Sequence, residues 1–408
     1  MNPSLLTAIS KGLQAASNLV FFHQLLHEPV FNSWFNLVKA LQEDDSAVDK
    51  YIDFLAQITM SALETSGDSW EYYLDREVLL LDNDLTRRLQ GDTEPSPSLL
   101  AALSRETVLL NRIREVNAGL LGQLCQQIAA EELPIAAGWG SKASHLPAAG
   151  SESLVTRYRQ MGSGPAAVYQ VLRWHPSEGI IGVAHPDQIT LHDLVGYQRQ
   201  KDALLNNTQR LLTGLPSQHA LLYGPKGSGK SSLIKAVARR YSSEGLRLIE
   251  VAADDLESLP AIVDYVRGRC QYFIIYIDDL SFEAYETGYK SLKNLLEGGV
   301  ENRPANLAVY ATSNRRHIVQ EYYSDRLDGD DLHPGETRQE KLALADRFGL
   351  SIFFPNADQQ LYLDMVMTMA DRRGINLPEA ELTARALTWE KERSGPSGRA
   401  ARQFVDSL

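Results

Sequence analysis

The chain has 408 residues, of which 44% are hydrophobic and 23% charged, so it is long enough for two or three domains with sizeable cores. Its formal net charge is −12, and residues 1–150 contain 19 acidic but 10 basic side chains. A protein that binds the phosphate backbone of nucleic acids in general needs a basic face, so this imbalance argues against such binding by the N-terminal part. A local basic patch elsewhere in the chain stays possible.

We expect neither a signal peptide nor a membrane span from the sequence. The N-terminus lacks a basic region before an apolar core, which argues against a signal peptide. The most apolar early run, residues 19–35, contains two histidines, a glutamate and a proline, which argues against a membrane span. Cys125 and Cys270 have no motif spacing, so they indicate neither a disulfide framework nor a zinc site, and we expect buried thiols. We therefore expect a cytoplasmic protein with no membrane partner.

Residues 1–135 show the hydrophobic periodicity of helices. Apolar residues recur three or four positions apart in three segments: Leu5, Ile9, Leu13 and Ala16; Tyr51, Leu55, Ile58 and Ala62; Leu109, Ile113, Val116 and Leu120. Gly91, Pro95 and Pro97 mark a break between helical units. The pattern predicts a mainly α-helical N-terminal domain over residues 1–135.

This N-terminal part contains no catalytic constellation. His23 and His27 lie four apart, as metal ligands on a helix would, but no third ligand is placed to complete a site, and we interpret them as a core or surface pair. Five aromatic residues are interpreted as core, with a partner-binding groove as the alternative: Trp34, Phe35, Trp70, Tyr72 and Tyr73.

Residues 136–188 are predicted to be a linker followed by an extended lead-in segment. The stretch PIAAGWGSKASHLPAAG at residues 134–150 is rich in small residues, glycine and proline, which is typical of a linker. Residues 154–189 alternate short apolar runs with glycine and proline, which indicates strands or extended chain.

Residues 189–355 alternate apolar runs with helical patterns. The runs predict strands at 220–223, 246–251, 273–277, 307–312 and 350–354, with helices at 198–212, at 229–241 and from about residue 259. This alternation indicates an α/β domain with a mostly parallel sheet that helices cover on both faces. Ligands of such sheets bind at the carboxyl ends of the strands, and the first, third and fourth strands end in polar residues.

The stretch LLYGPKGSGKSS, residues 221–232, contains the spacing G-x-x-x-x-G-K-[ST] between a strand and a helix. Because glycine has no Cβ, such a loop can wrap a polyphosphate with its N–H groups inward. Lys230 can reach the β- and γ-phosphates, and the Ser231 hydroxyl can ligate Mg²⁺. A Gly- and Ser-rich turn that matches by chance is the alternative. We expect ATP and Mg²⁺ as cofactors, bound by Gly224, Pro225, Lys226, Gly227, Ser228, Gly229, Lys230, Ser231 and Ser232.

The third predicted strand ends in two carboxylates, in FIIYIDD. Asp278 is placed to hold Mg²⁺ opposite Ser231, and Asp279 is placed to orient or deprotonate an attacking water. The alternative is a strand that ends in an ordinary Asx turn. Because a phosphate loop precedes this strand, the catalytic interpretation is favoured.

Residues from about 189 to 408 resemble the AAA+ superfamily of ATPases. The motifs follow the superfamily's order: GPKGSGKS as Walker A, FIIYIDD as Walker B, VYATSN as sensor 1, DRFG as the arginine-finger box and SGRAARQF as sensor 2. Within it the chain looks most like a bacterial group of predicted ATPases catalogued as a domain of unknown function. The segments IDDLSFE, LLEGGVENRPANLAVYATSNRRH and HPGETRQEKLALADRFGLSIFF carry that likeness.

The resemblance implies a fold and roles for particular residues. It implies a five-stranded P-loop NTPase core over residues 189–355 and a small helical lid over residues 356–408. Asn314 would be sensor 1, Arg347 would be a finger presented to a neighbouring subunit, and Arg399 would be sensor 2. Gly196 and Tyr197 fit the adenine-side turn. As alternatives, Asn314 is an ordinary turn residue and Arg347 pairs with Asp346.

The sequence departs from the superfamily at two places. The second acid of Walker B is usually Glu, and here it is Asp279, whose shorter side chain puts fast turnover in doubt. The lid contains both Arg399 and Arg402, and Arg399 is preferred for sensor 2 because it directly follows a Ser-Gly pair.

Three functions remain open. The first, which we favour, is an ATP-hydrolysing homo-oligomer that remodels or loads a protein client recruited by the acidic N-terminal domain. The second is a nucleotide-dependent binding switch with little turnover. The third is an ATPase linked to nucleic acid, a partner that the charge does not indicate. The charged stretch at residues 325–340 is either a solvated loop or a segment that couples the nucleotide state to a partner.

Overall fold

A computed structural model describes residues 3–43, 46–64, 70–91, 94–129, 133, 150–280, 286–297, 303–314, 347–391 and 395–408. The chain divides into two compact units: residues Met1–Tyr169 with Gly268–Cys270, and residues Gln170–Arg267 with Gln271–Leu408. Among the described residues, no helix combines the length and the apolar character that a membrane crossing needs.

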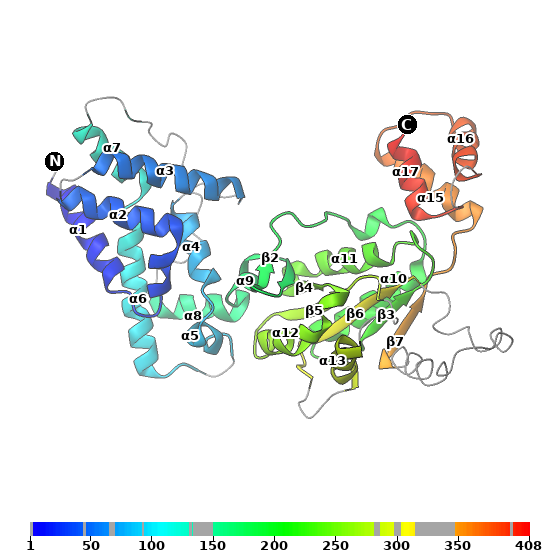
Figure 1. Ribbon diagram of the computed structural model, residues 1–408, viewed down its shortest axis with the longest axis horizontal. Helices are drawn as coiled ribbons and strands as arrows, with labels where there is room; N and C mark the ends of the chain where they lie inside the picture. The colour runs from blue at the N-terminus through cyan, green and yellow to red at the C-terminus, as the bar shows by residue number, and fades with distance from the viewer. Residues whose placement is uncertain are drawn as a thin grey trace. The chain divides into compact units, whose positions relative to one another are not determined.

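The N-terminal unit is helical, as the periodicity of residues 1–135 predicts (Figure 1). A short 3-10 helix at His23–His27 separates the first two α-helices. The α-helices are α1 (Pro3–Ser17), α2 (Pro29–Glu43), α3 (Ala47–Glu64), α4 (Trp70–Leu80), α5 (Asp84–Arg88), α6 (Pro97–Glu115), α7 (Ala118–Ile128), α8 (Gly150–Met161) and α9 (Pro165–Val168).

Several aromatic residues of this unit pack together in its core. Trp34 and Trp70 are buried and stack with ring centroids 5.2 Å apart, and Phe31 and Tyr73 pack against Trp70. The buried indole N–H of Trp34 keeps a hydrogen-bond partner, because Nε1 donates to the Val116 carbonyl at 2.8 Å. The interpretation of Trp34, Trp70 and Tyr73 as core residues is therefore confirmed, whereas Phe35 and Tyr72 are only half-buried.

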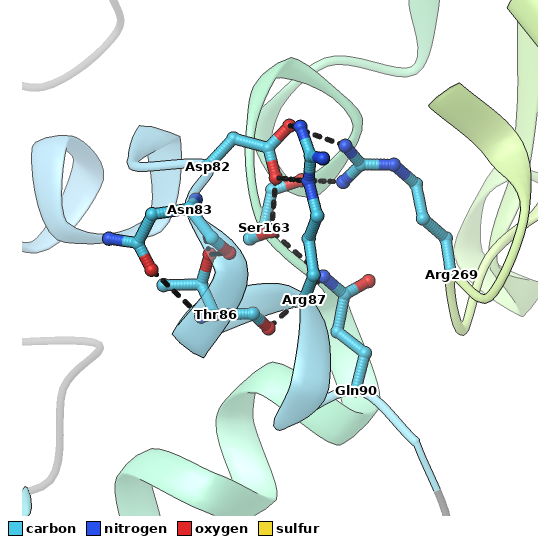
Figure 2. A network of polar contacts seen from close by, with 7 residues as sticks. All are labelled: Asp82, Asn83, Thr86, Arg87, Gln90, Ser163 and Arg269. Carbon is cyan, nitrogen blue, oxygen red and sulfur yellow. Dashed lines mark hydrogen bonds and ion pairs between the residues drawn. The ribbon is translucent and has the colours of Figure 1, made fainter. Parts of the chain in front are cut away.

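A buried polar network binds residues 268–270 into the N-terminal unit, although they lie on the chain between α12 (Leu259–Val266) and β5 (Tyr272–Ile277) (Figure 2). The Arg269 side chain is 2% exposed, pairs with Asp82 and donates to the Ser163 carbonyl at 2.8 Å. Arg87 donates to the same carboxylate at 3.0 and 3.2 Å. Burial acts to raise the pKa of Asp82, but the two guanidinium groups outweigh it and the net shift is downward. The network therefore pairs the buried guanidinium of Arg269 with the carboxylate of Asp82.

Residues 136–188 differ from the prediction. Residues 150–161, expected to be linker or extended chain, form helix α8, so the prediction is wrong there. The physical reason is that Leu154, Val155 and Tyr158 share one helical face and are buried in the core of the N-terminal unit. That unit consequently extends to Tyr169 rather than ending at residue 135. Residues 134–149 lie outside the described part of the chain.

The second unit is built on a seven-stranded sheet with the order β2-β1-β4-β5-β6-β3-β7. All neighbouring strands are parallel except β1 and β2. The predicted strands are confirmed, and β1 and β2 are added to them from the lead-in segment. The strands are β1 (Val171–His175), β2 (Gly179–Gly182), β3 (Ala220–Tyr223), β4 (Leu246–Val251), β5 (Tyr272–Ile277), β6 (Leu307–Ser313) and β7 (Leu350–Phe353).

Helices cover both faces of this sheet, as its apolar strands require. The helices are α10 (Gln198–Leu212), α11 (Lys230–Arg240), α12 (Leu259–Val266) and α13 (Glu286–Glu297), with short 3-10 helices at Leu191–Asp193, Ser242–Glu244 and Ala253–Ser258. Helices α10 and α11 lie on one face, and α12 and α13 lie on the other (Figure 1). The connection from β3 to β4 through α11 runs across the sheet in one direction, and the connections from β4 to β6 through α12 and α13 run in the opposite direction. Because crossovers between parallel strands are right-handed, a change of direction places the connecting helices on the other face.

Three further helices follow the last strand, in the region expected to form a helical lid. They are α15 (Gln359–Arg372), α16 (Glu379–Lys391) and α17 (Gly398–Asp406). Their buried side chains form a hydrophobic cluster of their own, which includes Tyr362, Val366, Ala401 and Phe404. Ser397 caps α17, since its hydroxyl accepts from the Ala400 N–H at 3.1 Å.

A buried histidine should make this unit sensitive to acid. His219 is 4% exposed, its Nδ1 accepts from the Val309 N–H at 3.0 Å, and burial lowers its pKa from 6.5 to about 3. Between pH 6.5 and about pH 3, His219 binds a proton in the unfolded chain but stays neutral in the native chain. The free energy of unfolding therefore falls as the pH falls. We expect the free energy of unfolding to drop by about 2 kcal/mol from pH 7 to pH 5 through this group. Urea denaturation of wild type and His219→Asn at both pH values checks this, because the asparagine can accept the same hydrogen bond without titrating. Equal pH dependence in the two proteins would contradict it.

Candidate functional site

A cavity of about 480 Å³ lies at the carboxyl ends of β3, β5 and β6. Parallel sheets bind ligands at this edge. Four parts of the second unit line it: the loop and helix start at residues 226–233; Asp278, Asp279, Thr312 and Asn314 at the strand ends; Ile189, Asp193, Leu194, Val195, Tyr197 and Lys201 before β3; and Phe354, Met365, Met369, Gly398, Arg399 and Arg402 after β7.

The loop between β3 and α11 has a backbone that only glycine adopts easily. Gly224, Gly227 and Gly229 have φ angles of 141°, 80° and 93°. A Cβ on Gly224 would lie 2.2 Å from the Phe354 carbonyl oxygen, so this position also lacks room for a side chain. Helix α11 begins at Lys230 and directs the partial positive charge of its N-terminus into the cavity. The loop is therefore shaped to surround an anion with backbone N–H groups.

Lys230 is the central cation of the cavity. It is 5% exposed, and its Nζ donates to the carbonyls of Gly224 and Pro225 at 2.9 and 2.8 Å and to Asn314 Oδ1 at 3.1 Å. Gly224 and Pro225 do not line the cavity themselves; they hold this ammonium group in place. Burial lowers the pKa of Lys230 to about 8, while the nearby carboxylates of Asp279 and Asp278 act against that shift.

Two hydroxyl groups converge on one oxygen of Asp278. Ser231 Oγ donates to Asp278 Oδ1 at 2.7 Å, and Thr312 Oγ1 donates to it at 2.6 Å. Burial acts to raise the pKa of Asp278, but these hydrogen bonds outweigh it and the net shift is downward. The group is thus an ionised carboxylate beside a hydroxyl. Such hard oxygen ligands fit Mg²⁺, so the residues expected to hold the metal are suited to it.

Asp279 and Asn314 contact each other across the ends of β5 and β6. Asn314 Nδ2 donates to Asp279 Oδ1, while Asn314 Oδ1 accepts from Lys230. Asp279 has a φ angle of 50°, which is strained for a residue with a Cβ. Its N–H donates to Thr312 Oγ1 at 2.9 Å. A carboxylate, an amide and an ammonium therefore form one hydrogen-bonded row on the wall of the cavity.

Helix α17 brings two arginines to the cavity. Arg399 and Arg402 both line the cavity. The geometry therefore does not select one of them as the sensor 2 residue. The Arg399 N–H donates to the Gly227 carbonyl at 3.3 Å, which ties the start of α17 to the phosphate loop. A Cβ on Gly227 would lie 3.1 Å from Arg399 Cβ. The start of α17 thus contacts the loop directly, as a lid would.

The turn at Gly196 and Tyr197, expected on the adenine side, brings one of its two residues to the cavity. Tyr197 lines the cavity, its ring packs on Phe354 with centroids 5.1 Å apart, and its hydroxyl donates to the Pro355 carbonyl at 3.1 Å. Gly196 does not line the cavity. Its φ angle of 76° shapes the turn, and a Cβ there would lie 2.4 Å from Leu361 Cδ1. Gly196 therefore shapes the turn that brings Tyr197 to the cavity.

Arg347 lies outside the cavity. It precedes β7, so it sits at the amino-end edge of the sheet, opposite the phosphate loop. Its Nε donates to Glu297 at the end of α13, and its Nη1 is buried with no hydrogen-bond partner among the described residues. Asp346, the alternative partner considered above, lies outside the described ranges, as does the whole stretch 325–340.

The profile of a protein family described as "Protein of unknown function (DUF815)" matches residues 167–408. The chain belongs to this family. The match confirms the resemblance to a group catalogued as a domain of unknown function, and the mostly parallel sheet agrees with the predicted α/β fold class.

Shorter similarities link the DUF815 chain to named proteins. It is 34% identical over 77 residues to a replication factor C large subunit of Methanococcus maripaludis and 38% identical over 77 residues to that of Thermofilum pendens. These alignments cover 19% of this chain, and 15% and 18% of the two relatives, so the chain spans less than a fifth of their length.

Among solved structures, the DUF815 chain is similar to the Thermotoga maritima RuvB Holliday junction branch migration motor. The identity is 13%, the TM-score is 0.35, and the alignment covers 54% of this chain and 72% of the other. A point mutant of the same RuvB protein is 14% identical over the same shares of the two chains and gives a TM-score of 0.36.

Four residues that line the cavity were not predicted from the sequence: Thr312, Lys201, Met365 and Met369. Thr312 contacts both aspartates, yet its only sequence signal is its place two residues before Asn314. Lys201 lines the cavity and donates to the Leu194 carbonyl. Met365 and Met369 also line it from α15, where helical periodicity gives no hint of a ligand.

Proposed function

We propose that the protein binds ATP with Mg²⁺ in this cavity and hydrolyses it. The observation that carries the proposal is the convergence of Lys230, Ser231 and Asp278, with Asp279 and Asn314, at the ends of three neighbouring strands. A lysine, a hydroxyl and two carboxylates beside a helix N-terminus are the groups that phosphoryl transfer uses.

Each of these groups has a definite task in the proposed reaction. The N–H groups of residues 227–232 and the Lys230 ammonium bind the β- and γ-phosphates. Asn314 orients the attacking water, and Asp279 accepts its proton. Arg399 and Arg402 contribute positive charge from the lid. Tyr197, Met365 and Met369 provide an apolar surface for the base.

Ser231 and Asp278 are the residues that would hold Mg²⁺. When bound, the metal neutralises charge on the phosphate oxygens. The two ligands are already joined by a 2.7 Å hydrogen bond, so little side-chain movement is needed to bring them to one ion.

Asp279→Asn should bind ATP normally but hydrolyse it about 10²–10⁴-fold more slowly, because the amide can hold water but cannot accept its proton. Phosphate release under saturating ATP measures this. Asp254→Asn is the matched control, since it makes the same charge change at an exposed position outside the cavity. Unchanged turnover in Asp279→Asn would place the base elsewhere.

One contact favours a second candidate, a nucleotide-dependent switch with slow turnover. Asp279 is engaged by the Asn314 amide, and its side chain is shorter than the Glu usual at this position. Both features reduce its reach toward a water molecule. Tight ATP binding together with negligible hydrolysis by the wild-type protein would support the switch over the ATPase.

We further propose that the protein acts as a homo-oligomer on a protein client recruited by its N-terminal unit. The position of Arg347 supports this, because its guanidinium serves no group in the cavity of its own chain. Affinity capture with the Asp279→Asn variant and ATP tests it, since a trapped ATP state should retain the client. A DNA-linked ATPase is the alternative that the name of the curated relatives supports, and stimulation of turnover by DNA would favour it.

A further inference from the structure

Thr312 is the one hydroxyl that contacts both strand-end aspartates in the described part of the cavity. It lies near the end of β6, between β5 with its two aspartates and β3 with the phosphate loop. The side chain is 2% exposed, so water does not compete for its hydrogen bonds.

The two hydrogen bonds use the hydroxyl in both of its capacities. It donates its proton to Asp278 Oδ1 at 2.6 Å and accepts the Asp279 N–H at 2.9 Å. The first bond fixes the rotamer of the proposed metal ligand. The second fixes the backbone of the proposed base, which has a φ angle of 50° and needs such support.

The main chain extends the same arrangement. The Thr312 carbonyl accepts the Leu280 N–H at 2.7 Å, so residues 278–280 are all bound to this one residue of β6. Leu222, the neighbour of Thr312 on β3, precedes the phosphate loop by two residues. Thr312 thus keeps both carboxylates in register with the loop.

We propose that Thr312 is a positioning residue for the reaction, acting through Asp278 on the metal site and through Asp279 on the base. This inference rests on the proposed function. The hydroxyl rather than the methyl group carries the role, because Oγ1 makes both of these side-chain hydrogen bonds. Removing it should weaken the metal dependence of nucleotide binding as well as turnover.

Thr312→Val, Thr312→Ala and Thr312→Ser separate these contributions. Valine keeps the shape without the hydroxyl, and serine and alanine differ from each other by the hydroxyl alone. Calorimetry with ADP, in Mg²⁺ and in EDTA, measures the gain in affinity that the metal provides. We expect this gain to fall about tenfold in the valine and alanine variants and to stay within about threefold of wild type in the serine variant. ADP affinity in EDTA should not change, and turnover should fall in the same order.

Two results distinguish failure of this inference from failure of the proposed function. A wild-type protein that neither binds nucleotide nor hydrolyses ATP would overturn the function. A wild-type protein that does both, together with a serine variant as impaired as alanine or a valine variant as metal-dependent as wild type, would overturn the role of Thr312 alone. Should Thr312→Val fail to fold, the comparison of serine with alanine still decides between these results.

Discussion

Lys230→Ala should lower ATP affinity by about 10²–10⁴ and remove measurable turnover. The lysine is buried at the start of α11, with its ammonium held on the carbonyls of Gly224 and Pro225. At pH 7 it is charged, because its pKa of about 8 lies above that pH. Losing two charge-assisted hydrogen bonds to phosphate at roughly 1.5–3 kcal/mol each gives this range. Isothermal titration calorimetry with ATP and Mg²⁺ measures it.

The matched control is Lys235→Ala. It removes an equal charge from the same helix, at a position outside the cavity where the ammonium lies 3.8 Å from Asp187. Its ATP affinity should stay close to that of wild type. Circular dichroism and the unfolding midpoint show whether each variant is folded. A folded Lys230→Ala protein with unchanged ATP affinity would mean that the phosphates do not bind in this loop.

The sequence predicts the centre of the site well because its signals are local. The strand β3, the glycine loop and the start of α11 occupy adjacent positions, so one short motif specifies a strand, a turn and a helix together. Asp278 and Asp279 follow an apolar run, and parallel strands bring their carboxyl ends to one edge. The meeting of these residues at one edge of the sheet therefore follows from the sequence without any knowledge of side-chain contacts.

The remaining features depend on contacts between segments far apart in the chain. The task of Thr312 follows from β6 lying between β3 and β5, which its own neighbours in sequence do not specify. Arg399 and Arg402 both reach the cavity because of the way α17 packs, which a preference based on one Ser-Gly pair cannot capture. Helix α8 packs through a short apolar face, and the glycine- and proline-rich stretches on either side obscure its period.

We propose that Arg347 completes the active site of a neighbouring subunit, so Arg347→Ala should bind ATP normally and hydrolyse it about 10³–10⁵-fold more slowly. Phosphoryl transfer spreads negative charge over the equatorial oxygens, and a cation added to Lys230, Arg399 and Arg402 stabilises that charge further. A guanidinium from outside the loop can balance that charge. Arg347 cannot do so in its own chain, since the length of β7, about 13 Å, separates it from the phosphate loop.

Glu297→Ala provides the control that distinguishes a finger from a structural ion pair. This variant removes the carboxylate that pairs with Arg347 and leaves the guanidinium intact. If the arginine only braces the end of α13, both variants should lose activity through the same loss of stability. If it serves a neighbouring subunit, Glu297→Ala should keep most of its turnover while Arg347→Ala loses nearly all of it.

Mixing two inactive variants tests whether the arginine acts between subunits. Lys230→Ala subunits bind nucleotide too weakly to turn it over but carry Arg347, and Arg347→Ala subunits bind nucleotide but lack the guanidinium. Within a mixed assembly, an Arg347→Ala subunit beside a Lys230→Ala subunit regains a complete site, so activity should reappear and wild-type turnover per subunit should rise with protein concentration. Light scattering shows whether the variants assemble together. A co-assembled mixture without activity, combined with a wild-type rate that is independent of concentration, would restrict Arg347 to its ion pair with Glu297.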